Sequence, residues 1–512
     1  MSEKFNVPSE LPRYPQSMWR TITTLPTFPE LREDIEVDVT VVGAGIAGVT
    51  TAYLLSLEGY KVALIDAGRI LDGTTGYTTA KISAQHGMIY SEFLTNFRPE
   101  IAKAYYEAND EALRFIRETV RANDIDCDFK EETAYVYTNQ EDKVDDLRKE
   151  FDAYQELGIP GQWHEGLPIP VEAKAAISMP GQAQFNPLKY LKFLVEKIVE
   201  NGGVVYENTT IEDAEYGKPI QVFTTDKANT IRCNEMVVAS HYPFWNFQAG
   251  YFSRLKIERS YALAVKPETT FQGGMYVSID DEKRSIRSAT FEGEEVLIVG
   301  GENHEPGKSD KTFDHYLALE KFAGTTFGVT EIPFRWSAQD ITTLDKIPYI
   351  GPFSSDYPFV FIATGFNKWG MTNGTVAGLL LRDNILRRTN PYMDVFNPGR
   401  FNDKSMNQNI VTGFKMAKEL IAGKFAGAHE KLSNLEPDQG ALVRHHGKKV
   451  GAYRDPQGEL FLVDTTCTHM GCETAWNEAE RSWDCPCHGS RFSYSGEVLE
   501  GPAKEPLKRV EE

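Results

Sequence analysis

Cysteine and histidine occur together in two short segments near the C-terminus of the chain. Cys467 and His469 form a Cys-x-His pair, and Cys485 and His488 form a Cys-x-x-His pair. A [2Fe–2S] cluster in which two Cys bind one iron and two His bind the other needs this ligand set. Two loops that each supply one thiolate and one imidazole can provide it. We therefore expect these four residues to ligate such a cluster.

Zinc is the alternative metal for these ligands, because it also accepts two sulfur and two nitrogen donors. A zinc finger usually takes both Cys from one loop and both His from the other. Here each loop mixes the two residue types, and each carries a second cysteine, Cys472 or Cys487. The mixed loops favour the iron–sulfur cluster over zinc.

A second cofactor signature lies near the N-terminus. An apolar, β-rich run at residues 37–42 leads into residues 43–48, which read Gly-Ala-Gly-Ile-Ala-Gly, and a helical pattern follows at 49–58. The first glycine of such a βαβ unit permits a tight turn, the second lets a pyrophosphate approach the backbone, and the third lets helix and strand pack closely. Asp66 ends the next strand, where an acid can bind a ribose hydroxyl. This order predicts a dinucleotide site at the helix N-terminus, without separating FAD from NAD.

Later regions bear on the identity of the dinucleotide. Residues 72–87 are rich in small and hydroxyl side chains, which suits a loop wrapped along a long cofactor. Residues 361–374 read as a strand, a glycine turn and a helix start, which could aim a helix N-terminus at an electron-rich ring edge. Together with residues 335–351, these features resemble the flavoprotein family of D-amino-acid oxidase, glycine oxidase and sarcosine oxidase. The resemblance covers about residues 36–390 and is strongest at its two ends.

This resemblance implies FAD as the cofactor and suggests which residues contact it. The implied contacts are Gly43, Gly45, Ile46, Ala47, Gly48 and Asp66 for the ADP half; Thr74, Thr75, Thr79, Ala80 and Lys81 for the pyrophosphate or flavin; Val205 and Ala239 on further strands; and Gly365, Gly370, Met371 and Thr372 for the flavin ring. Lys81 could instead be a surface lysine beside a turn. His86 could anchor FAD covalently, as a histidine does in some relatives, but its spacing from Asp66 does not match such a pattern.

Residues 433–512 resemble Rieske proteins, including the high-potential kind found in respiratory and photosynthetic cytochrome complexes. In that kind, the positions matching Cys472 and Cys487 form a disulfide, so the resemblance implies this pair here. Ser490 stands where those relatives use a serine hydroxyl, whereas Phe492 replaces a tyrosine whose hydroxyl bonds a cysteine sulfur. Hydrogen bonds to the sulfurs raise the reduction potential. We therefore expect a potential that is high for the class but below its upper end.

The expected fold is an α/β FAD-binding domain of the Rossmann-like, glutathione-reductase type with an interleaved α+β substrate domain and a C-terminal all-β Rieske domain. Helical patterns occur at residues 99–122, 187–200 and 405–422. The expected divisions are an N-terminal arm over the FAD domain at 1–34; the FAD domain at 35–90, 181–250 and 336–390; the substrate domain at 91–180 and 251–335; a helical linker at 391–432; and the Rieske domain at 433–512.

Composition limits the partners and the compartment. The formal net charge of −20 argues against nucleic acid, whose binding relies on an excess of Lys and Arg, and against docking on anionic membranes. No apolar run reaches the length of about 18 residues that predicts a transmembrane helix, and the N-terminus does not read as a signal peptide. We therefore expect a cytoplasmic protein. Cys127 and Cys233 are expected to be buried thiols. Cytosolic disulfides are rare, so a bond between Cys472 and Cys487 would need shielding beside the cluster.

The two cofactors favour a dehydrogenase, because flavin accepts two electrons as a hydride and the cluster accepts one at a time. The resemblance suggests a small amine, N-methyl amine or amino acid as substrate, and an external protein as electron acceptor or donor. A flavin monooxygenase fed through the cluster and a non-enzymatic electron carrier are the alternatives. Catalytic residues are not assigned. A carboxylate substrate would call for a bidentate arginine, with Arg254, Arg259, Arg287 and Arg335 as candidates. Tyr251, Tyr261 and His304 are candidates for shaping the pocket.

Overall fold

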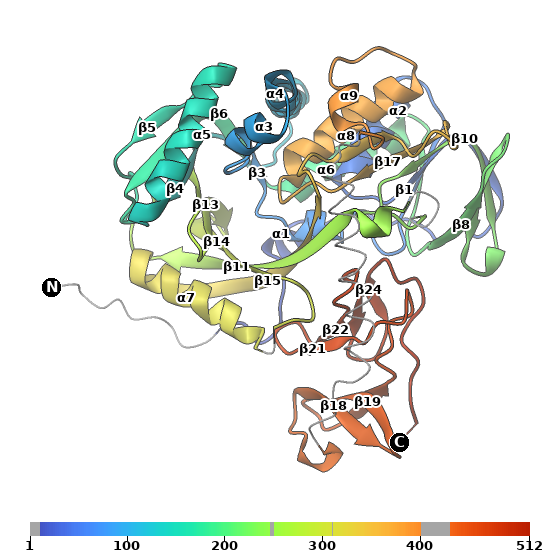
Figure 1. Ribbon diagram of the computed structural model, residues 1–512. Coiled ribbons are helices and arrows are strands. Elements are labelled where there is room, and N and C mark those ends of the chain that lie inside the picture. The colour runs from blue at the N-terminus through green and yellow to red at the C-terminus, as the bar shows by residue number, and fades with distance from the viewer. Residues whose placement is uncertain (1–10, 246–249, 310, 401–430, 512) are drawn as a thin grey trace.

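Figure 1 shows a computed structural model of the chain, which describes residues 11–245, 250–309, 311–400 and 431–511. Two large sheets with their helices form the main body, and the C-terminal strands form a separate unit beneath it. The helix expected at 405–422 lies outside the described residues. Within the described part, no helix is both long and apolar enough to cross a membrane.

The first sheet carries the dinucleotide motif. Its strands are β1 (Ile35–Val42), β2 (Val62–Ile65), β7 (Val204–Tyr206), β8 (Ile211–Glu215), β9 (Ile220–Thr224), β10 (Thr230–Val238), β16 (Tyr349–Pro352) and β17 (Val360–Thr364). The order is β16-β17-β10-β1-β2-β7, and the pairs from β17 to β7 are parallel. β8 and β9 form a hairpin beside β10. The central parallel strands are buried on both faces, so helices must cover the sheet on both sides.

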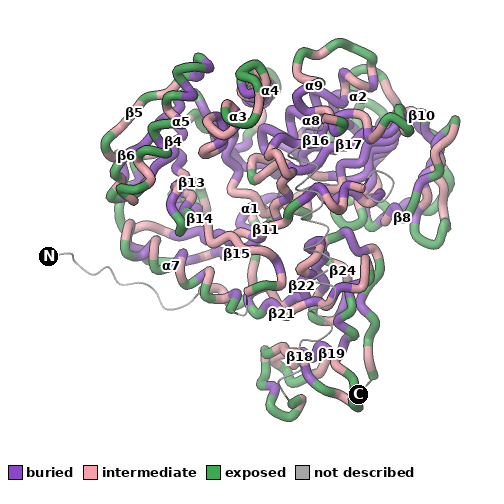
Figure 2. The backbone as a smooth tube through the Cα atoms, viewed as in Figure 1, coloured by how far each residue is buried: buried purple, intermediate pink, exposed green. Residues whose placement is uncertain are grey.

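Three helices pack closely in this half of the body: α2 (Ile46–Leu57), α6 (Pro187–Glu200) and α8 (Gly370–Ile385). α2 contacts both of the others and is therefore buried at nearly every position. The predicted helix at 187–200 is confirmed, and it begins where Asn186 accepts the backbone N–H groups of Leu188 and Lys189 at 3.1 and 3.2 Å. Figure 2 shows buried residues gathered around α8, β16 and β17.

The second sheet belongs mainly to the predicted substrate domain. Its strands are β3 (Lys81–Ile82), β4 (Lys130–Thr138), β5 (Gln162–His164), β6 (Ala175–Gln184), β11 (Leu255–Pro267), β12 (Met275–Ser278), β13 (Arg284–Phe291), β14 (Glu294–His304) and β15 (Val329–Thr343). They run in the order β15-β11-β14-β13-β12-β4-β6-β3, with β5 beside β6. The accompanying helices are α3 (Tyr90–Asn96), α4 (Pro99–Ala122), α5 (Val144–Leu157) and α7 (Phe313–Phe327). α4 confirms the predicted helix at 99–122.

Strands of the second sheet cross the expected domain divisions. β6 continues past residue 180 to Gln184, and β15 begins before residue 336 and continues to Thr343. β3 also belongs to this sheet, although it lies within the segment 35–90 expected in the FAD domain. β15 stays in the sheet because it pairs with β11 along nearly its whole length. Sequence periodicity does not reveal such a pairing, since the partner strand lies far away in the chain.

The C-terminal unit is all-β, as expected. One sheet contains β18 (Gln439–His445), β19 (Lys448–Arg454) and β20 (Leu460–Val463), and the other contains β21 (Ala475–Asn477), β22 (Ser482–Asp484), β23 (Arg491–Ser493) and β24 (Val498–Glu500). The second of these sheets lies nearer to the flavoprotein body (Figure 1). The two Cys/His segments are the loops that follow β20 and β22.

A buried network of charges joins this unit to the body. Arg259 of β11 has no exposed side-chain surface, and its guanidinium lies 3.2 Å from a carboxylate oxygen of Glu500 and 3.7 Å from one of Asp484. Arg491 lies 2.7 Å from Glu500, 3.4 Å from Asp484 and 3.6 Å from Glu480. Burial opposes the charge on Glu500, but the two arginines outweigh it and hold its pKa at about 2. Glu500 therefore stays ionised in the protein interior, because both arginines face it.

The N-terminal arm also bridges the two units, which differs from the expected position over the FAD domain alone. Short helix α1 (Met18–Ile22) does lie there, with the Trp19 indole donating to the Thr78 carbonyl at 2.7 Å. Residues 11–16 instead run between the units. The Arg335 guanidinium donates to the carbonyls of Pro12, Arg13 and Ala479 at 2.5, 2.7 and 2.9 Å. A buried arginine needs such partners, and the arm supplies two of them.

Substituting Arg259 by methionine tests this junction. Arg259→Met leaves Glu500 and Asp484 with less compensation in the interior, so the variant should lose about 3–5 kcal/mol of stability. Urea unfolding of the loaded protein, followed by cluster absorbance, measures the loss. Arg232→Met is the matched control, because Arg232 and Asp34 form an exposed pair at 3.9 Å worth at most about 1 kcal/mol. Equal unfolding midpoints for the two variants would contradict the assigned role of the network.

Candidate cofactor sites

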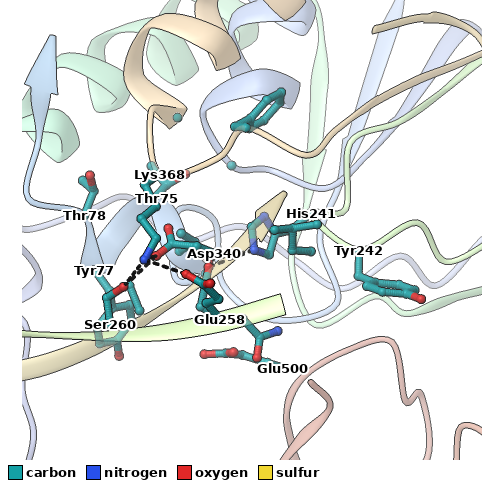
Figure 3. Close-up of a pocket in the computed structure, with 18 of the residues that line it drawn as sticks. Thr75, Tyr77, Thr78, His241, Tyr242, Glu258, Ser260, Asp340, Lys368 and Glu500 are labelled. Atoms are coloured by element: carbon teal, nitrogen blue, oxygen red, sulfur yellow. Dashed lines mark hydrogen bonds and ion pairs between the residues drawn. The ribbon is translucent and has the colours of Figure 1, made fainter. Parts of the chain in front are cut away.

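A cavity of about 1420 Å³ extends between the two large sheets to the surface of the C-terminal unit. Its walls include the glycine-rich turn after β1, the segment at residues 72–79, the ends of β11 and β15, and the N-terminus of α8. The C-terminal unit closes one side with residues 497–504. Figure 3 shows side chains from both sheets converging on this space, with Glu500 at its lower edge.

The turn after β1 has the geometry of a phosphate cradle. Gly43 has φ +106°, and a Cβ at Gly48 would lie 1.9 Å from the Gly43 carbonyl oxygen, so both positions require glycine. The N-cap residue of α2, Gly45, has no side chain that could cap the helix, and the Ile46 N–H donates to the Thr75 hydroxyl at 3.1 Å. Free N–H groups and the positive end of the helix dipole therefore face the cavity, which fits the pyrophosphate of a dinucleotide.

Asp66 lies at the end of β2, where the sequence predicted an acid for a ribose hydroxyl. Its carboxylate accepts the backbone N–H groups of Ala44 and Gly68 at 2.8 and 2.9 Å. Burial raises the pKa of Asp66 to about 6, against the effect of these two hydrogen bonds. The carboxylate lines the cavity, so it can accept a further hydrogen bond from a ligand hydroxyl.

The structure brings most of the expected FAD contacts to the cavity. The residues that line it are Gly43, Gly45, Ile46, Ala47, Asp66, Thr74, Thr75, Thr79, Lys81, Ala239, Gly370 and Met371. The expected contacts that lie behind its wall are Gly48, Ala80, Val205, Gly365 and Thr372. Gly48 and Val205 are packing residues. Gly48 lies against the backbone of Gly43, and Val205, in β7, is buried in the hydrophobic core.

Lys81 faces the cavity from β3 and is not a surface lysine. Its side chain is buried, and its ammonium bonds the Ser285 hydroxyl. Burial, with a contribution from Arg287, lowers the pKa of Lys81 to about 7. Among the described residues, no carboxylate lies within ion-pair distance of it. Lys81 can therefore hold or release a proton at near-neutral pH.

His86 has a structural role beside the N-terminus of α8. One ring nitrogen lies 2.7 Å from the Tyr105 hydroxyl, and the other lies 2.7 Å from the Ser83 carbonyl and 3.1 Å from the Thr372 hydroxyl. The ring stacks on Trp369 with centroids 4.6 Å apart. Burial lowers the pKa of His86 to about 3. Both nitrogens are thus engaged by protein groups that hold α8 against β3.

The four arginines considered as carboxylate anchors are all buried and bonded to other groups. Arg259 and Arg335 join the two units, as described above. Arg287 donates to the carbonyls of Ala80 and Phe185 at 2.7 and 3.2 Å. Arg254 lies over the Tyr251 and Tyr349 rings. The structure thus gives each arginine a packing or bridging role, because buried guanidinium groups need several acceptors or aromatic faces.

A second lysine, Lys368, also lines the cavity. The Lys368 ammonium lies 3.0 Å from the Glu258 carboxylate, 3.0 Å from the Ser260 hydroxyl and 3.8 Å from Asp340, as Figure 3 shows. Burial raises the pKa of Asp340, and Lys368 opposes that effect. Of the other residues named for the pocket, Tyr261 reaches the wall, with its hydroxyl 3.0 Å from His304. Tyr251 lies in the core beneath β16, where its hydroxyl donates to the Phe353 carbonyl at 2.8 Å.

The expected cluster ligands lie together in two loops of matching shape. The Cys467 N–H donates to the Cys472 carbonyl at 2.7 Å, and the Cys485 N–H donates to the Ser490 carbonyl at 2.8 Å. A disulfide between Cys472 and Cys487 ties the loops together, as the Rieske resemblance implied. Cys467 and Cys485 remain free thiols, and they are buried.

Two observations fit a bound metal centre in these loops. Both ring nitrogens of His488 are buried without a hydrogen-bond partner among the described residues. A buried ring with no partner indicates a missing ligand atom. The Cys467 and Cys485 thiols lie within hydrogen-bond distance of each other, which lowers the pKa of Cys467 and raises that of Cys485. Two cysteines this close can bind one iron.

Several cavity residues were not expected from the sequence. His241 and Tyr242 follow β10, and Gln339 lies near the end of β15. Short motifs do not mark these positions, because they are defined by the way the C-terminal unit docks. The positive φ of His241, +61°, becomes visible only in the structure.

Comparisons with known proteins agree with this geometry. The family described as FAD dependent oxidoreductase matches residues 38–384, and the Rieske [2Fe-2S] domain matches residues 428–511. A Bacillus subtilis (strain 168) protein, YhfW, whose name describes it as a Rieske 2Fe-2S iron-sulfur protein, is 44% identical over 97% of this chain and 98% of its own. The cytochrome b6-f complex iron-sulfur subunit 2 of Nostoc sp. is 46% identical over 11% of this chain and 30% of its own.

Solved structures resemble the flavoprotein body. Glycine oxidase from Geobacillus kaustophilus has a TM-score of 0.59 and 18% identity over 72% of this chain and 100% of its own. L-amino acid deaminase from Proteus vulgaris has a TM-score of 0.61 and 19% identity over 76% of this chain and 100% of its own. At such identities the likeness shows the fold. The cavity, the cluster loops and the family matches together show that the chain belongs to the FAD dependent oxidoreductases and carries a C-terminal Rieske [2Fe-2S] domain.

Proposed function

We propose that the protein is a dehydrogenase for a small amine, N-methyl amine or amino acid. The substrate carbon beside nitrogen gives a hydride to FAD, electrons pass singly to the Rieske cluster, and an external acceptor collects them. The observation that carries this proposal is the shared cavity, because one space is lined by the dinucleotide cradle and by residues 497–504 of the Rieske domain. Flavin supplies the two-electron chemistry and the cluster supplies the one-electron chemistry.

The charges of the cavity support a substrate that carries both signs. Lys368 offers a cation, and Glu258 and Asp340 offer anions beside it. An amino acid has an anionic carboxylate and a cationic amine. Such a substrate can place its carboxylate near Lys368 and its amine toward Lys81, which can accept a proton once it is neutral. The names of the solved relatives, glycine oxidase and L-amino acid deaminase, favour the same class.

A panel of amines and amino acids under anaerobic conditions tests the proposed function. Addition of the right substrate should bleach the flavin absorbance and then produce the paramagnetic signal of the reduced cluster. The variant His488→Ala, which lacks a cluster ligand, should still bleach but give no such signal. A protein whose flavin resists the whole panel, yet is reduced by electrons delivered to the cluster, would instead act in the reverse direction as a monooxygenase.

Lys81 is expected to handle the proton of the substrate amine. Below its pKa of about 7 the lysine is protonated and cannot accept a proton at Nζ, so kcat/KM should rise with pH through about 7. Lys81→Met should abolish this rise and lower kcat/KM by about 100-fold or more, the usual size of such a contribution. Lys103→Met, at an exposed site on α4, is the control. A variant profile that still rises near pH 7 would assign the proton to another group.

Phe492 sets one limit on the cluster potential. It is fully buried in β23 and packs in the core that contains Cys467 and Cys485. Phe492→Tyr should add a hydroxyl beside the cluster sulfurs and raise the midpoint potential, because a hydrogen bond stabilises the more negative reduced state. A redox titration followed by paramagnetic resonance measures the change. Phe461→Tyr, in β20 of the same domain, should leave the potential unaltered, and a drop or no change in Phe492→Tyr would refute this geometry.

A further inference from the structure

Tyr242 occupies the space between the flavin cavity and the cluster ligands. Its side chain lines the cavity and has 4% of its surface exposed. Its ring centroid lies 5.9 Å from that of His488 and 6.3 Å from that of His469, with edge-to-face orientations of 74° in both cases. Figure 3 shows Tyr242 set apart from the other labelled cavity residues, on the side that faces the Rieske loops. One flavoprotein side chain therefore touches both cluster histidines.

Local structure fixes the position of this tyrosine. β10 ends at Val238, and the left-handed backbone of His241 then turns the chain. The Thr364 hydroxyl donates to the His241 carbonyl at 2.5 Å, and the Ser240 hydroxyl donates to the Tyr242 carbonyl at 3.0 Å. These bonds hold the backbone on both sides of the ring, so the ring is positioned before the cofactors bind.

The tyrosine hydroxyl is buried without a hydrogen-bond partner among the described residues. Such a hydroxyl costs free energy unless a partner is present in the working protein. The rings of His469 and His488 lie beside the Tyr242 ring, so a cluster held by these histidines can accept its hydrogen bond. Phe492, the position that carries a hydroxyl in high-potential Rieske proteins, cannot supply one here.

The Rieske loop is pressed closely against the same wall. A Cβ at Gly489 would lie 2.6 Å from the side chain of Gln339, which itself lines the cavity. His488, the residue before it, has 3% of its surface exposed. His488 therefore faces the flavoprotein interior, where Tyr242 lies, and is covered in this arrangement, whereas His469 is partly exposed.

We propose that Tyr242 couples the Rieske cluster to the flavin cavity: its ring lies on the electron path between them, and its hydroxyl donates a hydrogen bond to the cluster. The direction of electron flow, from flavin to cluster, rests on the proposed function. FAD held at the turn after β1 would supply two electrons. The cluster held by Cys467, His469, Cys485 and His488 would take them one at a time and pass each to a one-electron acceptor protein, and the proton released with them would go to water.

Laser-flash reduction of the purified holoprotein by a photosensitiser tests the coupling without any substrate. Absorbance then follows the redistribution of one electron between flavin and cluster. Tyr242→Leu removes the ring and should slow the redistribution by about tenfold, equivalent to about 1.4 kcal/mol in the barrier. Tyr242→Phe keeps the ring, and should retain most of the rate while lowering the midpoint potential of the cluster.

Tyr357→Leu is the control, because Tyr357 packs in the same core against Trp245, away from the cluster. It should leave both the rate and the potential unchanged. A wild-type rate in Tyr242→Leu would overturn the coupling, and an unchanged potential in Tyr242→Phe would overturn the hydrogen bond. Tyr242→Phe conserves the packed volume, so it remains informative if the leucine variant does not fold. A protein that fails to oxidise any amine still gives the flash measurement, so the two proposals fail separately.

Discussion

The buried charge network around Arg259 decides how the two cofactor units face each other. Arg259 belongs to the flavoprotein sheet, whereas Asp484 and Glu500 belong to the Rieske domain. Each of these charges is buried, so each would cost several kcal/mol of stability if it lost its partner. Charges of this kind tolerate few alternative geometries, because each must find its partners at hydrogen-bond distance. The network therefore fixes the orientation of the Rieske domain on the flavoprotein body. Arg335 connects the N-terminal arm to the same junction. The proposed electron transfer depends on that orientation.

The docking has a functional consequence. The domain that bears the cluster ligands also closes the flavin cavity. Glu500 of the charge network lines the cavity wall, and Asp484 of the same network immediately precedes the cluster ligand Cys485. A Rieske domain that serves an outside partner would leave its histidine edge open. Here His488 is covered, and the covering residue is an aromatic one. The arrangement suits transfer within one chain, with the external acceptor approaching another edge of the domain.

The cofactor motifs were predictable because they are local. Gly43 and Gly48 must be glycine because a Cβ at either position would clash with the backbone. The Cys/His loops need their spacing to bring the ligands to one metal centre. Both motifs can therefore be found directly in the sequence. Helices 99–122 and 187–200 follow from apolar periodicity and a proline start. These features identified the two cofactors and the three kinds of domain.

Features that depend on distant pairing were not predictable. Two of the arginines considered as carboxylate anchors are buried in contacts with distant segments: Arg259 meets acids more than 200 residues away, and Arg335 meets the N-terminal arm. Tyr242 carries no motif, since its importance arises only when the Rieske loops pack against it. The divisions at 180/181 and 335/336 fall inside β6 and β15 because strand pairing, and not composition, determines where those strands end.

The most direct test of this account is a crystal structure of the protein loaded with FAD and iron, with the irons located by anomalous scattering. The account predicts two irons held by Cys467, His469, Cys485 and His488, beside the Tyr242 ring, and FAD in the cavity on the other side of that ring. A single tetrahedral zinc at these ligands, or a Rieske domain docked with its histidines turned away from the cavity, would contradict it.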